Sequence, residues 1–200
     1  MSVLNQDYPN IELIVVDDGS KDGTPDAAEK FDRRVKVLRQ DNSGPAAARN
    51  RGIAAASGDF IAFLDADDIW LPGKLALQVQ YLQAHPDVGV VFGGFLRWYP
   101  QTGSSFMSAL KPENLDSPLK LVPEHSGWIY KDILLDSVIC IITAMVRRSV
   151  IETVGSFDES LRTGEDYDFW LRVSRQFRTA GFDRTLAYYR MHAASTTRVA

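Results

Sequence analysis

The chain has 200 residues, of which 45% are hydrophobic, and this size and composition are typical of one soluble globular domain. Its net charge of −4 at pH 7 argues against a nucleic-acid partner, because such proteins neutralise phosphates with Lys and Arg. The single cysteine, Cys140, excludes an intrachain disulfide, and its apolar neighbours indicate a core residue rather than a nucleophile. Polar residues at 5–7 interrupt any apolar stretch near the N-terminus, so we expect a cytoplasmic protein, either free or peripheral to the inner face of a membrane.

Strands and helices are predicted to alternate through the first hundred residues. Apolar and β-branched runs predict strands, while proline near a helix start and apolar residues at helical spacing predict helices. The predicted strands cover 11–16, 35–38, 60–64 and 88–96, and the predicted helices cover 24–31, 45–56 and 72–85. This alternation is typical of an α/β domain with a Rossmann-type mixed, mainly parallel sheet flanked by helices.

The second half of the chain is less regular. Prolines and scattered serines predict an irregular segment over 102–127, and long loops of this kind tend to be functional or mobile. Regular structure is predicted again over 138–147, in helices over 149–154 and 163–177, and in a last strand over 186–191. No internal repeat divides the sequence, so we interpret residues 1–200 as a single domain.

The most informative side chains are Asp65 and Asp67, which directly follow the apolar run at 60–64. The carboxyl end of a buried strand is where open α/β sheets bind ligands, and two carboxylates on one turn can reach the same small region. Such oxygens suit a hard divalent cation that also binds substrate phosphates, so the pair suggests a metal-bound diphosphate. The alternative is that both are ordinary turn residues, and the pair taken alone favours that alternative.

Two further clusters stand at element ends in the first half. Asp17 and Asp18 follow the first predicted strand, where a carboxylate can recognise a base or a ribose, although an Asx-turn with Gly19 is the simpler interpretation. Arg49 lies in a predicted helix of small residues, and its rigid donor fork can hold a nucleotide or its phosphates. A solvated arginine on a helix surface explains Arg49 about equally well.

Acidic and basic side chains near the end of the chain complete the set. Glu165 and Asp166 can supply a general base for an incoming hydroxyl, but Thr163 with Asp166 also resembles a capping box. Locally, capping is the better interpretation. His192 can hold a diphosphate or complete a metal shell if it lies in the cleft, whereas a lone histidine near a strand end is usually structural or exposed.

Taken together, these residues resemble family-2 glycosyltransferases with the GT-A fold. The resemblance runs from Ser2 almost to the end of the chain, and five motifs occur in the family's order. They lie at 2–12, 16–24, 42–52, 63–68 and, as the late pattern, at 155–159 with 164–172. Each motif alone is modest, but the ordered set is highly specific.

The resemblance implies a donor site in about residues 1–100. An aspartate of the Asp17 and Asp18 pair should contact the base, Asp65 should face the ribose, and Asp67 should bind the metal on the diphosphate. The donor is then a nucleotide-diphosphate sugar, for which UDP is a plausible nucleotide. The cofactor is Mn²⁺ or Mg²⁺, and the sequence does not separate them because both suit oxygen ligands.

The resemblance also implies the chemistry. Asp166 should be the catalytic base with Glu165 in support, Arg49 should lie beside the nucleotide, and His192 should lie near the phosphates. About residues 101–200 should bind the acceptor, which is a growing polysaccharide, a lipid-linked glycan or a protein. The implied reaction is a metal-assisted, inverting transfer to a hydroxyl by one direct displacement, in which the metal offsets charge on the leaving diphosphate.

The sequence departs from the family's pattern at its start. Family members normally open with an apolar strand, and this sequence opens at the last turn of the helix that follows it. We therefore expect weaker nucleotide binding than in a longer relative, and an open sheet edge that favours self-association, for example as a homodimer. A truncated, non-catalytic nucleotide-binding module is the first alternative function. A nucleotidyltransferase is the second, but it calls for a glycine-rich phosphate loop with a basic residue at 17–20.

Overall fold

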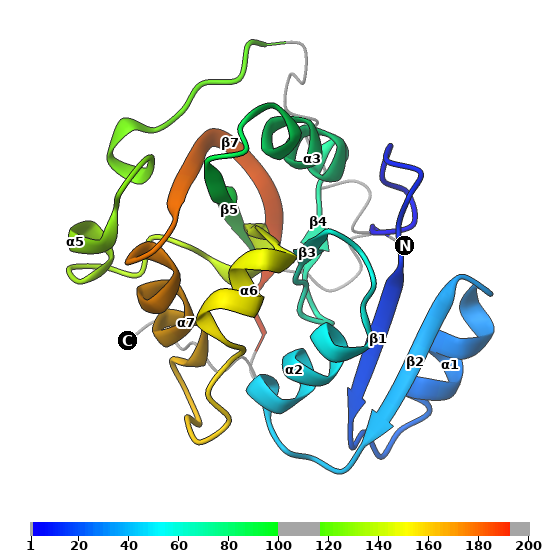
Figure 1. Ribbon diagram of the computed structural model, residues 1–200. Coiled ribbons are helices and arrows are strands. Elements are labelled where there is room, and N and C mark those ends of the chain that lie inside the picture. The colour runs from blue at the N-terminus through cyan, green and yellow to red at the C-terminus, as the bar shows by residue number, and fades with distance from the viewer. Residues whose placement is uncertain (1, 100–116, 193–200) are drawn as a thin grey trace.

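The computed structural model describes residues 2–99 and 117–192 and has α/β architecture (Figure 1). The strands are β1 (Leu13–Asp18), β2 (Val35–Gln40), β3 (Phe60–Ala62), β4 (Ile69–Trp70), β5 (Val88–Trp98), β6 (Met145–Arg147) and β7 (Arg178–Arg190). The helices are α1 (Thr24–Phe31), α2 (Pro45–Ala55), α3 (Lys74–Ala84), α5 (Tyr130–Ile133), α6 (Arg148–Val154) and α7 (Glu165–Ser174), with 3₁₀ turns η1 (Pro123–His125) and η2 (Ile141–Thr143). The α/β class and the alternation in the first hundred residues are confirmed.

The strands form two hydrogen-bonded sheets, which differs from the single sheet that we expected. One has the order β1-β2 and the other the order β3-β6-β5-β7-β4. The two long ladders, β1 with β2 and β5 with β7, are parallel, while the three short ladders are antiparallel. Within the described residues β1 pairs with β2 only and β3 with β6 only, and this divides the sheet.

The β1-β2 sheet lies at one side of the molecule with α1 (Figure 1). Its strand β1 is apolar in sequence, yet Leu13, Ile14, Val15 and Val16 are only partly buried. Helix α2 lies against β1, where Gly52 leaves room for the Val16 side chain. This sheet is therefore joined to the rest of the fold mainly through α2.

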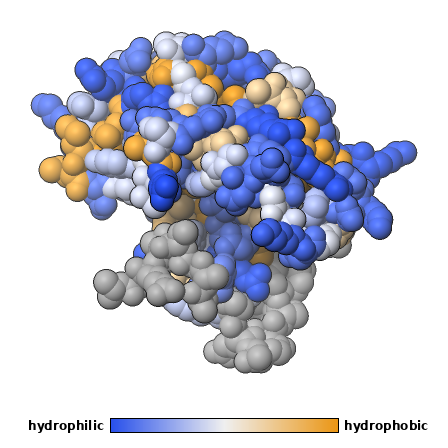
Figure 2. Space-filling view, turned by 90° about the horizontal axis from the view of Figure 1, so that it is seen from below, coloured by the Kyte–Doolittle hydropathy of each residue, from blue (hydrophilic) through white to orange (hydrophobic). Residues whose placement is uncertain are grey.

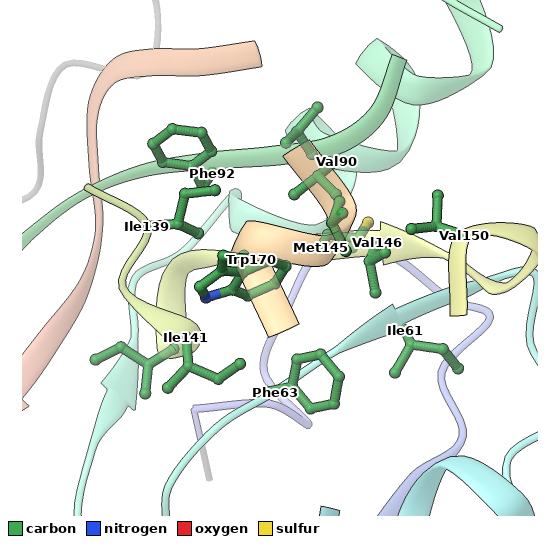
Figure 3. Packing of buried hydrophobic residues seen from close by; sticks show 14 of the residues in the cluster. Ile61, Phe63, Val90, Phe92, Ile139, Ile141, Met145, Val146, Val150 and Trp170 are labelled. Atoms are coloured by element: carbon green, nitrogen blue, oxygen red, sulfur yellow. The ribbon is translucent and has the colours of Figure 1, made fainter. Parts of the chain in front are cut away.

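The hydrophobic core lies in the five-stranded sheet and the elements packed on it. Trp170 of α7 is 1% exposed and lies among labelled side chains of β5, β6 and the segment leading into η2 (Figure 3). Phe63, which follows β3, also belongs to this group, and its ring meets that of Phe157 edge to face, with centroids 5.4 Å apart. The turn after β3 therefore begins next to a residue that is firmly packed in the core.

Several element boundaries differ from the expectations. The last strand begins at Arg178 rather than at residue 186, and β4 and α5 had not been expected. Helix α3 begins at Lys74, because Gly73 precedes it in a left-handed conformation with φ of 82°. Of the segment expected to be irregular, 102–116 lies outside the described residues, and 117–127 touches β7 through two isolated bridges.

Candidate active site

Asp18 ends β1, and its carboxylate holds the loop that leads from β2 into α2. Oδ1 accepts hydrogen bonds from the Gln40 side chain and the Ser43 N–H, and Oδ2 accepts one from the Gly44 N–H, each at 2.8 Å. Burial alone would raise the pKa of Asp18, but these hydrogen bonds outweigh it and hold the pKa below its ordinary value. Because Gly44 is the N-cap of α2, Asp18 fixes where that helix begins.

Asp17 is engaged in the turn that follows β1. It is 9% exposed, and its Oδ1 accepts a hydrogen bond from the Ser20 N–H at 3.3 Å, the local bonding of an Asx-type turn. Gly19 supplies the turn's left-handed residue, with φ of 83°. In the described part of the chain, the side-chain hydrogen bonds of Asp17 and Asp18 stay within residues 17–44 and do not reach the group around Arg49.

Arg49 of α2 joins two carboxylates that are far apart in the sequence. Its Nη1 donates to Glu165 Oε1 at 2.5 Å and its Nη2 donates to Asp65 Oδ1 at 3.0 Å. The side chains of Arg49 and Glu165 are 13% and 9% exposed, whereas Asp65 is 41% exposed. The interpretation of Arg49 as a solvated residue is therefore wrong, and the turn after β3 meets the start of α7 at this side chain.

Asp166 follows Glu165 in the first turn of α7 and is partly buried. Burial raises its pKa above the ordinary value, and the neighbouring Glu165 carboxylate raises it further. Its Oδ1 accepts a hydrogen bond from the Tyr167 N–H at 2.8 Å. The expected capping box is not formed, because Gly164 is the N-cap and no side chain caps the helix. A partly buried carboxylate with a raised pKa has the properties of a general base.

Asp67 and His192 come together from the turn after β3 and the end of β7. His192 Nε2 lies 2.8 Å from Asp67 Oδ2. The His192 side chain is 34% exposed and the Asp67 side chain is 44% exposed. A carboxylate oxygen and an imidazole nitrogen are both ligands for a divalent transition metal. Residues 2–99 and 117–192 hold no preformed group of three or more metal-ligating side chains. The pair fits a metal that takes its remaining ligands from a diphosphate and water.

Asn50 belongs to the site's framework, although sequence reasoning did not single it out. Its Oδ1 accepts the Phe157 N–H at 2.9 Å, and its Nδ2 donates to the Phe157 carbonyl and to Glu159 Oε1. These bonds fasten the loop before α7 to α2, and they place the Phe157 ring beside the Arg49 guanidinium, 5.6 Å from its centroid. The available signal was an asparagine inside a helix, where it is unfavourable unless its side chain finds such partners.

Cys140 takes no part in this chemistry. Burial raises the pKa of its thiol to about 12, so the reactive thiolate is scarce at neutral pH. The thiol packs against the core, as the apolar sequence around it predicts.

The surface around the strand ends is mostly polar. Figure 2 looks from below toward the end at which the β1 and β2 arrows stop in Figure 1, and this face is hydrophilic over much of its centre and right-hand side. Hydrophobic residues gather at its left edge, on the side where Figure 1 places α5, and Leu134 and Leu135 directly after α5 are 52% and 88% exposed. Among the described helices, none has the length and apolar character needed to cross a membrane.

Comparison with known proteins decides the family. The family described as "Glycosyl transferase family 2" matches residues 1–155. The chain belongs to this family. The glycosyltransferase TuaG from Bacillus subtilis (strain 168), which is named for teichuronic acid biosynthesis, is 35% identical over 196 residues, covering 95% of this chain and 71% of TuaG. An uncharacterized glycosyltransferase of Rickettsia bellii (strain RML369-C) is 29% identical over 198 residues, which are 98% of this chain and 27% of that protein. The chain thus spans between about a quarter and about seven tenths of these relatives.

Solved structures of glycosyltransferases share the fold. S. aureus TarS 1-349 in complex with UDP-GlcNAc has a TM-score of 0.74 at 22% identity, over 99% of this chain and 56% of that chain. The mannosyltransferase PcManGT from Pyrobaculum calidifontis, in complex with GDP-Man and Mn²⁺, has a TM-score of 0.67 at 20% identity, over 94% and 50% of the two chains. The expected GT-A fold is confirmed for this family-2 glycosyltransferase.

Proposed function

We propose that this chain carries out a metal-assisted, inverting transfer of a sugar from a nucleotide-diphosphate sugar to a hydroxyl acceptor. The observation that carries the proposal is the Arg49 bridge, which ties Asp65 at the end of β3 to Glu165 beside Asp166. It brings a candidate donor carboxylate and a candidate base within one small region. Residues of about 1–100 then form the donor half, and residues of about 101–200 form the acceptor half.

The donor is a nucleotide-diphosphate sugar, and UDP is the nucleotide that we favour. The UDP-GlcNAc complex of TarS, which shares this fold, supports that choice. Asp65 would face the ribose, with Arg49 beside the nucleotide, and an aspartate of the β1 end would contact the base. The Asp18 carboxylate binds three donors of its own chain and Asp17 is only 9% exposed, so both aspartates of the pair stay candidates for this contact.

Asp67 and His192 would hold a divalent metal on the diphosphate. The metal is Mn²⁺ or Mg²⁺, and the Mn²⁺ complex of PcManGT together with the imidazole nitrogen at this site favours Mn²⁺. When bound, such a metal offsets the charge that builds on the leaving diphosphate. The protein's own contribution is to present a carboxylate and an imidazole from two different elements at one point.

Asp166 would act as the base in a single displacement. The acceptor oxygen forms a bond to the anomeric carbon of the sugar, the bond from that carbon to the diphosphate oxygen breaks, and the acceptor's proton moves to the Asp166 carboxylate. The sugar's anomeric configuration is inverted because one displacement takes place. Glu165 is held by Arg49 and keeps the first turn of α7 in position for this step.

The acceptor that we favour is a growing polysaccharide handled at the inner face of a membrane, with lipid-linked glycans and proteins as the other classes. The name of TuaG, a relative that this chain covers over 71% of its length, supports the polysaccharide. The unpaired edge of β1 among the described residues would also allow two copies to associate as a homodimer.

Release of UDP from UDP-sugars tests the proposal. With Mn²⁺ present, the chain should release UDP from at least one UDP-sugar, Asp166→Asn should lose nearly all turnover while retaining UDP affinity, and Asp59→Asn should match the unmodified chain. Asp59 is an exposed aspartate just before β3, so it controls for loss of one surface charge. UDP binding without turnover by the unmodified chain would support the non-catalytic module instead.

A further inference from the structure

Asp68 lies on the same turn as Asp65 and Asp67, yet it is almost completely buried. Asp68 as a whole residue is 6% exposed, whereas Asp65 is only partly buried and Asp67 is exposed. The Asp68 N–H donates to the Asp65 carbonyl at 3.0 Å and closes the turn. Asp68 therefore cannot meet the donor as its neighbours can, and its carboxylate must serve another purpose.

The carboxylate of Asp68 binds the end of β7. In the antiparallel ladder between β4 and β7, Leu71 donates to the Leu186 carbonyl, and Ile69 pairs with Tyr188. At the next position of this alternating pattern, the Arg190 N–H donates to Asp68 Oδ1 at 2.7 Å. A side-chain oxygen from Asp68, the residue just before β4, thus continues the ladder past the first residue of that strand.

This contact fixes the chain two residues before His192. On the other side of the same segment, the Met191 N–H donates to the Trp98 carbonyl of β5 at 2.8 Å. The end of β7 is therefore held from both sides before it delivers the His192 ring to Asp67. The two contacts have different origins, because one is a strand ladder and the other depends on a single side chain.

A carboxylate is a costly choice for this position if its only purpose is stability. Asp68 Oδ2 is buried and has no hydrogen-bond partner among the described residues. A buried polar atom without a partner costs free energy, so its presence at this position calls for an explanation.

We propose that Asp68 is a positioning residue that clamps the end of β7 to the turn after β3 and so holds His192 against Asp67. The inference rests on the proposed function in one respect, since the metal site is where its consequence would be felt. The clamp itself is a property of the fold, and it can be measured without donor or metal.

Two variants distinguish the effect of losing the hydrogen-bond acceptor at Asp68 from the effect of losing its charge. Asp68→Ala removes the acceptor of the Arg190 N–H, whereas Asp68→Asn keeps an oxygen there and removes the charge. In the absence of ligands, Asp68→Ala should speed amide hydrogen exchange at Arg190, and it should move the His192 ring signal in the NMR spectrum, at fixed pH, to its position in Asp67→Ala. Asp68→Asn should keep both close to those of the unmodified chain.

The consequence at the metal site is measured by calorimetry with UDP and Mn²⁺. Asp68→Ala should weaken metal-dependent UDP binding by about tenfold, as loss of an outer partner of a metal ligand typically does, and Asp68→Asn should restore it. In the Asp68→Ala background, His192→Ala should cause little further loss, because the histidine is already displaced.

The ligand-free measurements decide the inference by themselves. An unmoved His192 signal in Asp68→Ala, or equal disturbance in Asp68→Asn and Asp68→Ala, would overturn the clamp. Independent, additive losses for Asp68→Ala and His192→Ala in the binding experiment would also overturn it. If the unmodified chain bound no UDP while the ligand-free results held, the proposed function would fail and the clamp would stand.

Discussion

Arg49 connects two parts of the candidate site, because its side chain bonds to Asp65 after β3 and to Glu165 in α7. It is nearly buried, and it balances one partly exposed carboxylate and one buried carboxylate, Asp65 and Glu165. Removing one partner of a buried ion pair is costlier than never having had the pair, because the remaining charge stays in a poorly solvated place. The planar fork of the guanidinium matters too, since Arg49 donates from two separate nitrogens, whereas all the donors of a lysine lie on one nitrogen.

Arg49→Met should therefore lower the free energy of unfolding by about 2 kcal/mol, less than for a fully buried pair because Asp65 reaches solvent. The measurement is urea unfolding at pH 7. Adding Glu165→Gln to Arg49→Met should recover part of the loss, since it removes the stranded charge. Arg34→Met, which breaks an exposed pair with Asp32, is the control and should change stability little. Equal effects of the two arginine substitutions would contradict the bridge.

Asp166 leads to a prediction about pH. Burial and the adjacent Glu165 raise its pKa, and the base must be deprotonated to accept the acceptor's proton. The value of kcat/KM should therefore fall as pH is lowered, with a midpoint above the ordinary aspartate range near 4. Glu165→Gln should move that midpoint down, because it removes a neighbouring negative charge. A midpoint that is not raised above the ordinary aspartate range, or one unchanged by Glu165→Gln, would argue against Asp166 as the base.

Helix α3 is anchored to the core by a buried, charged residue type, Lys74, together with Gln78. Lys74 in its first turn is 0% exposed, donates to Gln78 Oε1 at 2.7 Å and lies 4.2 Å from the centroid of the Trp70 ring. Gln78 in turn donates to carbonyls of β5 and η2, at Val91 and Thr143. Burial lowers the pKa of Lys74 well below its ordinary value of 10.5.

The Lys74 ammonium makes stability depend on pH in a defined direction. The unfolded chain holds this proton up to about pH 10.5, whereas the folded chain releases it at lower pH, so stability should increase as pH rises through that window. One proton corresponds to a slope of at most about 1.4 kcal/mol per pH unit. Unfolding free energies measured upward from pH 7 toward the ordinary lysine value of 10.5 should show a rising component that Lys74→Met removes and that exposed Lys30→Met retains. Parallel pH curves for all three proteins would contradict a neutral, buried lysine.

The elements that the sequence predicts well are those with a local signal. Helices α1, α2 and α6 and strands β1 and β2 follow from proline and glycine positions and from apolar runs. Strand β4 has two residues and exists only because β7 pairs with it, so it has no local signal. The early part of β7 contains glycine and charged residues, which are not typical of a strand. The capping box at α7 was wrong because Gly164, not Thr163, adopts the cap position.

The sequence points to individual candidate residues of the site, but it does not predict which of those residues contact one another. Asp65 and Asp67, like Glu165 and Asp166, stand at element ends that local patterns locate. The bond between Arg49 and Glu165 joins residues 116 positions apart, so no local pattern contains it. The burial of Asp68 likewise depends on where the end of β7 lies.

At the scale of the whole molecule, we expect the small β1-β2 sheet to be less stable than the five-stranded sheet. The apolar residues of β1 are only partly buried and lie outside the main core, whereas Val90 and Val91 of β5 are 0% exposed. A two-stranded sheet gains little from its own ladder and depends on packing against other elements. Asp17 and Asp18 belong to this less supported sheet.

Hydrogen exchange should reveal this order directly. Peptides covering β1 and β2 should exchange their amide hydrogens faster than peptides covering β5 and β7, because they open without disrupting the main core. Saturation with UDP and Mn²⁺ should slow exchange at β1 more than at α6. Uniform protection across both sheets would show that the β1-β2 sheet is as firmly held as the rest.

The central claim is that Asp67 holds a divalent metal on the diphosphate of a bound nucleotide, and calorimetry of UDP binding with and without Mn²⁺ tests it most directly. The proteins to compare are the unmodified chain, Asp67→Ala, and Asp59→Ala as the matched control. We expect Mn²⁺ to strengthen UDP binding to the unmodified chain and to Asp59→Ala, and we expect this strengthening to be lost in Asp67→Ala. UDP binding that is equal with and without Mn²⁺, or unchanged in Asp67→Ala, would contradict the claim. The absence of UDP binding to the unmodified chain would contradict the donor site itself.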